Sequence, residues 1–169
     1  MSLHQSPSQT IGPMYGYALY QEGMDAAVAP DDPGALTIAG RLLDGDDEPI
    51  PYPEGLIEVW QGEMFARART DAFGVWRVRV RKPVDVAPLS DGRSQAPYLN
   101  VTVFARGLLK QVQTRVYFPD EPAANAADPV LGLVDSGRRD LLIADALKDG
   151  TLSFDIRIQG DRETVFFDF

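Results

Sequence analysis

The side chains that most often bind transition metals are scarce in this sequence, which holds one histidine and no cysteine. Without cysteine, disulfide bonds and thiolate metal sites are excluded, and iron, zinc or copper sites then depend on several imidazoles. The one imidazole, His4, lies in a polar terminal segment, where a solvated side chain is expected. A metal site that needs two or more histidines therefore cannot be built from this chain alone.

Carboxylates are plentiful, but their spacing predicts no acid–base pair. Four of them could supply the pair that a glycoside hydrolase needs: Glu58, Asp155, Asp161 and Glu163. The sequence places no two of them together, and lone carboxylates are usually surface groups. The acidic run 44–48 lacks the ordered ligands of a helix-flanked calcium loop, so a solvated turn is the simpler interpretation. With a single histidine, Ser–His nucleophilic catalysis is also disfavoured.

Arginines alternate along one predicted strand, where Arg77, Arg79 and Arg81 share a face opposite to Trp76. Stacking platforms for nucleic acids need aromatic and basic side chains on one surface. The formal net charge of −9 also disfavours binding to a phosphate backbone. We therefore interpret the stripe as a charged outer sheet face or a polar protein interface, and we expect no nucleic-acid partner.

A segment before the first predicted strand, Ser8 to Pro13, is mostly small and polar with a rigid end. Gly12 permits a close approach of the backbone, and Pro13 fixes its own backbone while restricting Gly12. Taken alone, these residues favour an ordinary disordered terminus over an arm that lies against another surface.

Short β-branched and aromatic runs between glycines and prolines predict an all-β domain, a β-sandwich with long loops and little helix. The predicted strands are residues 35–43, 56–61, 75–81, 98–105 and 112–118, and a hairpin turn at Asp149-Gly150 leads into 151–158. Residues 83–97 are expected to form a loop and 125–134 to hold one short helix, while 141–147 is ambiguous between helix and strand.

No internal repeat or second domain is evident, so we expect a single domain over residues 1–169. The N-terminus lacks the regions of a signal peptide, and no apolar run approaches the roughly 18 residues that span a bilayer. We expect a cytoplasmic chain without a membrane partner. Three phenylalanines in the last four residues predict a tail that is docked on its own core or on a partner.

Several motifs occur in a characteristic order along the chain. They are Pro7-Ser8-Gln9-Thr10-Ile11-Gly12-Pro13, Leu56-Ile57-Glu58-Val59-Trp60-Gln61, Phe104-Ala105-Arg106-Gly107, Thr114-Arg115-Val116-Tyr117-Phe118 and Phe154-Asp155-Ile156-Arg157-Ile158-Gln159-Gly160. Together with the ending Glu163-Thr164-Val165-Phe166-Phe167-Asp168-Phe169, they resemble the α subunits of intradiol ring-cleavage dioxygenases over nearly the whole chain.

The resemblance implies an enzyme built from α and β chains of the same sandwich fold, in a higher-order oligomer. The homologous β subunit of such an enzyme holds non-haem Fe(III) through two tyrosines and two histidines, and its iron activates the bound catecholate. The α subunit binds no metal and is inactive alone. The implied reaction inserts both atoms of O2 into protocatechuate and gives 3-carboxy-cis,cis-muconate.

The resemblance also assigns roles to particular residues. Residues 1–34 are expected to form an N-terminal arm that contacts the partner chain. The substrate-pocket positions at the α/β interface are Thr10, Gly12, Pro13, Tyr15 and Arg115. Met14 stands where the family usually has tyrosine, so Tyr15, one place later, is the candidate for that position. A hydroxyl, a closely approaching backbone and a permanent positive charge suit an anionic dihydroxybenzoate.

The metal-binding positions of the β subunits are altered here. Their two histidines correspond to Tyr98 and Asn100, at alternate positions of the strand that follows Pro97. Both imidazoles are absent, in agreement with the histidine count, so the resemblance implies a degenerate metal site. The connection after Gln61 is also shorter than is usual in the family.

Two other interpretations remain open at this stage. The chain could be a non-enzymatic β-sandwich module that binds carbohydrate or protein through its loops. A self-sufficient iron dioxygenase is the third possibility, and the single histidine argues strongly against it.

Overall fold

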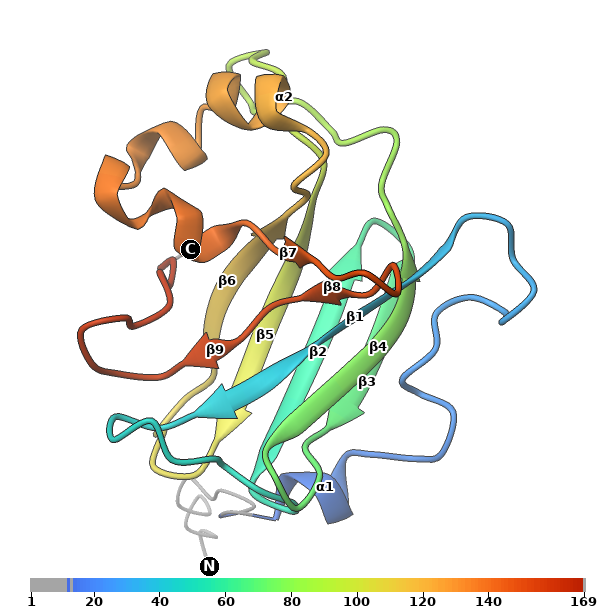
Figure 1. The fold of residues 1–169 in the computed structure, drawn as a ribbon, viewed down its shortest axis with the longest axis vertical. Coiled ribbons are helices and arrows are strands. Elements are labelled where there is room, and N and C mark those ends of the chain that lie inside the picture. The colour runs from blue at the N-terminus through green and yellow to red at the C-terminus, as the bar shows by residue number, and fades with distance from the viewer. Residues whose placement is uncertain (1–11, 13, 169) are drawn as a thin grey trace, which may run out of the picture.

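The computed structural model describes residue 12 and residues 14–168, which form two packed β-sheets with little helix (Figure 1). The first sheet contains β1 (Ala35–Leu43), β4 (Val75–Arg81), β7 (Asp145–Ala146), β8 (Leu152–Ser153) and β9 (Ile156–Arg157). The second contains β2 (Gly55–Gln61), β3 (Met64–Arg69), β5 (Tyr98–Ala105) and β6 (Val112–Tyr117). The helical elements are α1 (Tyr15–Ala18), α2 (Pro122–Ala127) and two 3-10 helices, η1 (Leu131–Leu133) and η2 (Ser136–Leu142). The predicted all-β sandwich is confirmed.

The core lies between the two sheets. Ile38 from β1 and Val80 from β4 belong to one buried cluster with Ile57 from β2 and Val103 from β5, and none of the four is accessible to solvent. Each such side chain stabilises the fold by about 1.5–3 kcal/mol when it is fully buried. Because side chains alternate along a strand, the residues between these core positions point to the outer faces of the sandwich.

The four-stranded sheet has the order β3-β2-β5-β6, with all neighbouring strands antiparallel. At the centre of the other sheet, β1 pairs antiparallel with β4 and parallel with both β8 and β9. The predicted strands 35–43, 75–81 and 98–105 match β1, β4 and β5 in their bounds. β3 was not predicted, because alternating alanine and arginine carry little of the β-branched signal on which strand prediction depends.

The predicted strand over residues 151–158 is interrupted, which corrects that expectation. It forms the two short strands β8 and β9, separated by Phe154 and Asp155. The Asp155 carboxylate accepts the backbone N–H of Arg41 at 2.9 Å, so a side chain replaces the backbone hydrogen-bond ladder at this point. The hairpin predicted at Asp149-Gly150 does form, between β7 and β8.

The single helix predicted over residues 125–134 is also wrong. The structure has α2 from Pro122, a residue suited to a first helical turn, and a separate η1. Pro129 favours an extended backbone at Asp128, whose carboxylate accepts the N–H groups of Val130 and Leu131 at 2.9 and 2.7 Å. The helix therefore ends before Asp128. The segment 141–147, which was ambiguous between helix and strand, contains both: the end of η2 and then β7.

A glycine lets the C-terminal strands approach β1. A Cβ atom at Gly40 would lie 1.8 Å from the carbonyl oxygen of Phe154, a separation that real side chains do not allow. Gly40 lies between the β1 residues that pair with β8 and those that pair with β9. Its missing side chain is therefore what allows the segment 152–157 to run alongside β1.

The C-terminal tail is docked on its own chain, which is the first of the two predicted alternatives. Phe166 packs against the main core, and Phe167 forms a backbone bridge with Gln113 of β6. The Thr114 hydroxyl donates to the Val165 carbonyl at 2.7 Å. Phe169 lies outside the described residues.

Candidate degenerate metal site and N-terminal arm

The two positions predicted to have lost their metal ligands lie on the outer face of the four-stranded sheet. Leu99 and Val101 of β5 point into the core, so Tyr98 and Asn100 point the other way. On the neighbouring strand β6, Arg115 pairs with Asn100 in the register. The structure thus brings together three of the residues that the sequence singled out.

Arg115 is held tightly in this group. Its guanidinium carbon lies 3.7 Å from the centre of the Tyr98 ring, a close cation–π contact. Its Nη1 donates to Oε1 of Gln95 at 2.9 Å and to the Tyr117 hydroxyl at 3.4 Å. Only 6% of Arg115 is exposed. The side chain is therefore a fixed positive charge just beneath the sheet surface.

A buried carboxylate supports this arrangement from behind. The Tyr117 hydroxyl donates to Oδ1 of Asp128 at 3.1 Å, and Oδ2 of Asp128 accepts the backbone N–H of Ala96 at 2.8 Å. Asp128 is 2% exposed and also caps the turn after α2. Burial raises the pKa of Tyr117 well above its ordinary value, which keeps its hydroxyl protonated as the donor. Asp128 therefore ties three separate segments to the Arg115 group.

The residues present do not fit a metal ion. Tyr98 and Asn100 offer one phenol and one amide, and the permanent charge of Arg115 lies directly against the phenol ring. A cation at that distance opposes the binding of a second cation. Within residues 12 and 14–168, no group of three or more histidine, cysteine, aspartate or glutamate side chains could hold a metal. His4 lies outside the described residues.

The N-terminal arm is described in part. Thr10 and Pro13 lie outside the described residues, so their predicted pocket roles remain predictions. Gly12 has a φ of +59°, in the left-handed region that favours glycine. Tyr15, in α1, packs its ring against Phe104 with 5.7 Å between ring centres. Phe104 lies on the same outer sheet face as Asn100, because its neighbours Val103 and Ala105 belong to the core.

Tyr15 and Arg115, the predicted pocket residues that the structure places on the sheet, therefore lie apart on one face. Tyr15 covers one end of β5, at Phe104, while Arg115 lies opposite Asn100, four residues away along the strand. Four residues of a strand span about 13 Å. In Figure 1, α1 lies near the bottom of the sheet and α2 lies near its top. Within the described residues these side chains do not enclose one pocket.

Other candidate residues have structural roles. Glu58 forms a salt bridge with Arg67, and Asp155 forms one with Arg41, so these carboxylates are not an acid–base pair. The acidic turn closes on itself, since Oδ1 of Asp44 accepts two backbone N–H groups of the same loop. In the arginine stripe, Arg81 pairs with Asp32.

Sequence reasoning missed Gln95, Tyr117 and Asp128. Tyr117 could have been found, because it lies two residues after Arg115 and therefore on the same face of the strand. Asp128 carries a weaker signal, an aspartate directly before a proline inside the segment 125–134 that was predicted to be helical. Gln95 is in a loop, and nothing in its local sequence indicates the contact with Arg115.

Solved structures of dioxygenases share this arrangement of sheets. The dioxygenase domain of a dioxygenase carbohydrate-binding protein fusion from Streptomyces sp. SirexAA-E superposes with a TM-score of 0.62 at 22% identity, over 91% of this chain and 97% of that one. For hydroxyquinol 1,2-dioxygenase from Pseudomonas putida DLL-E4 the TM-score is 0.60 at 19% identity, over 90% and 67% of the two chains. The fold is that of the intradiol dioxygenases.

No family model matches the sequence, but curated relatives align along nearly all of it. The protocatechuate 3,4-dioxygenase alpha chains of Burkholderia cepacia and Pseudomonas putida are each 38% identical to it over 199 aligned positions, 99% of this chain and 98% of each relative. The chain belongs to the family of protocatechuate 3,4-dioxygenase alpha chains. This similarity favours a dioxygenase subunit over a carbohydrate- or protein-binding module.

The alignment spans more positions than the 169 residues of the chain, so gaps open in this sequence, and β2 and β3 are joined here by only Gly62 and Glu63. Among the described residues, none of the helices has the length and apolar character that a membrane crossing requires.

Proposed function

We propose that this chain is the non-catalytic α subunit of an iron(III)-dependent protocatechuate 3,4-dioxygenase, and that a homologous β subunit carries the iron. The complex cleaves the ring of protocatechuate between its two hydroxyl-bearing carbons and places one atom of O2 on each, giving 3-carboxy-cis,cis-muconate. In this proposal residues 1–34 form the arm that contacts the β subunit, and the α chain is inactive alone.

The observation that carries the proposal is the arginine that lies against the altered ligand strand. Where the family resemblance expects two histidines, this chain has Tyr98 and Asn100, and Arg115 lies over the Tyr98 ring. This donor set does not fit an iron site, which supports the assignment of the iron to the partner. The fixed positive charge of Arg115 instead suits the carboxylate of protocatechuate. With Arg115 we assign Thr10, Gly12, Pro13 and Tyr15 to the substrate pocket at the α/β interface.

The same sheet face offers a surface for the β subunit. Trp60 pairs directly with Asn100 on one side and with Phe65 on the other, and these two aromatic side chains are 37% and 42% exposed. Exposed tryptophan and phenylalanine beside an interface site are typical of the residues that dominate binding. We propose that they are covered by the β subunit in the complex.

Replacement of Trp60 by alanine is expected to weaken assembly with the β subunit about tenfold, because a buried interface tryptophan typically contributes more than 1 kcal/mol. The measurement is the dissociation constant of the α/β pair. The matched control is Phe73→Ala, which removes an aromatic side chain that is 74% exposed in the turn between β3 and β4. Equal effects of the two replacements would exclude this face as the interface.

The proposal as a whole is tested by co-expression with the candidate β chain. We expect a coloured, iron-containing complex that consumes O2 in the presence of protocatechuate, and an isolated α chain that is colourless and inactive. A stable α monomer that does not bind the β homologue would favour the binding-module interpretation instead.

A further inference from the structure

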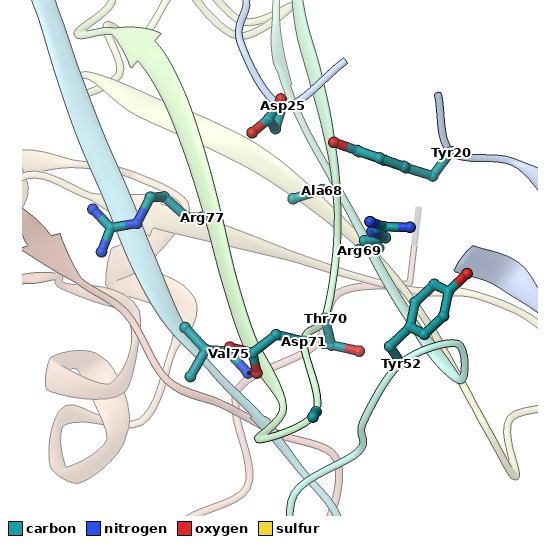
Figure 2. Close-up of a pocket in the computed structure, with 10 residues that line it drawn as sticks. Tyr20, Asp25, Tyr52, Ala68, Arg69, Thr70, Asp71, Val75 and Arg77 are labelled. Atoms are coloured by element: carbon teal, nitrogen blue, oxygen red, sulfur yellow. Dashed lines mark hydrogen bonds between the residues drawn. The ribbon is translucent and has the colours of Figure 1, made fainter. Parts of the chain in front are cut away.

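Arg69, the last residue of β3, lies between two tyrosine rings (Figure 2). Its guanidinium carbon is 4.8 Å from the centre of the Tyr20 ring and 4.7 Å from that of Tyr52. These residues line one wall of a surface cavity of about 550 Å³ between β3 and β4. On the opposite wall Arg77 points away from the stack, as Figure 2 shows. The cavity therefore has one arginine in an aromatic cage and one outside it.

The cage connects β3 to the described part of the N-terminal arm. Tyr20 follows α1 in the arm, and Tyr52 belongs to the loop before β2. Tyr52 also contacts Tyr17 of α1, with 5.0 Å between the ring centres and an edge-on geometry. The four side chains form a continuous series of contacts in the order Tyr17, Tyr52, Arg69 and Tyr20. Two of the four come from the arm, so the stack joins the arm to the sandwich on both sides of Arg69.

Two further contacts hold the same segment. Gly16 donates its N–H to the Pro53 carbonyl at 2.8 Å, and a Cβ atom there would lie 2.7 Å from the Tyr52 ring, so only glycine lets α1 pack this closely. Arg67, two residues before Arg69 and on the same face of β3, donates from Nη1 to the Leu19 carbonyl at 2.8 Å. Residues 16–20 are therefore fixed to the sheet by a backbone bond, a ring stack and two arginines.

The protonation state of the cage suits a cation–π stack. Burial, together with the nearby Asp25 carboxylate, raises the pKa of Tyr20, and burial likewise raises the pKa of Tyr52. Both rings are consequently neutral phenols at neutral pH, while the guanidinium remains charged. The cation–π contact is therefore retained at neutral pH.

We infer that Arg69 is a positioning residue that fixes the root of the N-terminal arm, and through it the arm residues that reach the β subunit's substrate pocket. The anchoring of the arm by Arg69 does not depend on the proposed function, whereas its effect on the substrate pocket rests on it. Gly12 is four residues before Gly16, so a fully extended chain between them spans at most about 14 Å. An arm segment this short transmits the placement of its root to its tip. Movement at Gly16 would therefore displace Gly12.

The test replaces Arg69 by methionine in the full α chain and compares it with Arg77→Met, which removes the other arginine of the same cavity. Two quantities are measured: amide hydrogen exchange of residues 14–20 in the α chain alone, and steady-state kinetics of the α/β complex with protocatechuate. For Arg69→Met we expect exchange in this segment to accelerate about five- to tenfold, and the KM to rise by a similar factor while kcat stays within twofold. Arg77→Met should leave the exchange rate and the KM within twofold of the wild-type values. Arg69→Lys should raise the KM less than Arg69→Met does.

The outcomes separate this inference from the proposed function. Unchanged exchange in Arg69→Met overturns the anchoring role. Faster exchange with an unchanged KM supports the anchor but overturns the role of the arm in the pocket. If Arg69→Met does not fold, Tyr20→Leu removes one ring of the cage and is expected to give the same pattern with smaller changes. Equal effects of the Arg69 and Arg77 replacements would also overturn the inference.

Discussion

Replacement of Arg115 by alanine is expected to raise the KM for protocatechuate roughly 10- to 100-fold in the α/β complex while changing the KM for catechol much less. A hydrogen bond to a charged group contributes about 1.5–3 kcal/mol, and catechol lacks the carboxylate that such a charge would bind. The measurement is the ratio of the two KM values in the variant and in the wild type. It isolates the charge, because both substrates experience any damage to the fold equally.

Two variants refine this result. Arg115→Lys keeps a positive charge but loses the planar fork, and should lie between the wild type and Arg115→Ala. Arg115→Met removes the charge while still filling the space over the Tyr98 ring. Equal losses for protocatechuate and catechol in all three variants would show that Arg115 has only a structural role.

Replacement of Asp128 by alanine is expected to lower the free energy of unfolding by about 3–5 kcal/mol. The change leaves the Tyr117 hydroxyl and the N–H groups of Ala96 and Leu131 without their buried acceptor. Each unsatisfied buried donor costs about 1–3 kcal/mol. Urea unfolding, followed by tryptophan fluorescence, measures the difference directly.

The control for Asp128 is Asp135→Ala. Asp135 is exposed and accepts one weak bond from the Gly137 N–H at 3.4 Å, so its loss should change the free energy of unfolding by less than about 0.5 kcal/mol. A comparable loss in both variants would contradict the assignment of Asp128 as the link between α2, the loop before β5 and β6.

Where core and solvent-facing residues alternate strongly, the sequence predicted the exact first and last residue of the strand, as in β1, β4 and β5. Each has β-branched or aromatic residues on its core side, and that local signal is sufficient. β3 escaped prediction because its core side is formed by Ala66 and Ala68, whose small side chains fit beneath neighbouring strands but carry little strand preference. Its place in the sheet depends on its pairing with β2.

The sequence predicted some of the residues that belong to the candidate site, but not how they contact one another. The sequence indicated Tyr98, Asn100 and Arg115 separately, but their contact depends on the register between β5 and β6, which long-range pairing sets. The support from Asp128 requires knowledge of where the segment after β6 returns to the sheet. The stack around Arg69 joins three segments that are far apart in the sequence, so no local pattern could reveal it.

The parallel pairing of β1 with β8 and β9 has a consequence for biogenesis. Arg41 in β1 meets a partner 114 residues later, so β1 has one unpaired edge for most of the time that a ribosome needs to make the chain. Contacts of such long range slow folding, and an open strand edge invites association with other chains. Chaperone dependence should therefore be highest before the segment 152–157 emerges. The face proposed for the β subunit lies on the other sheet, so assembly there does not require that edge to be closed.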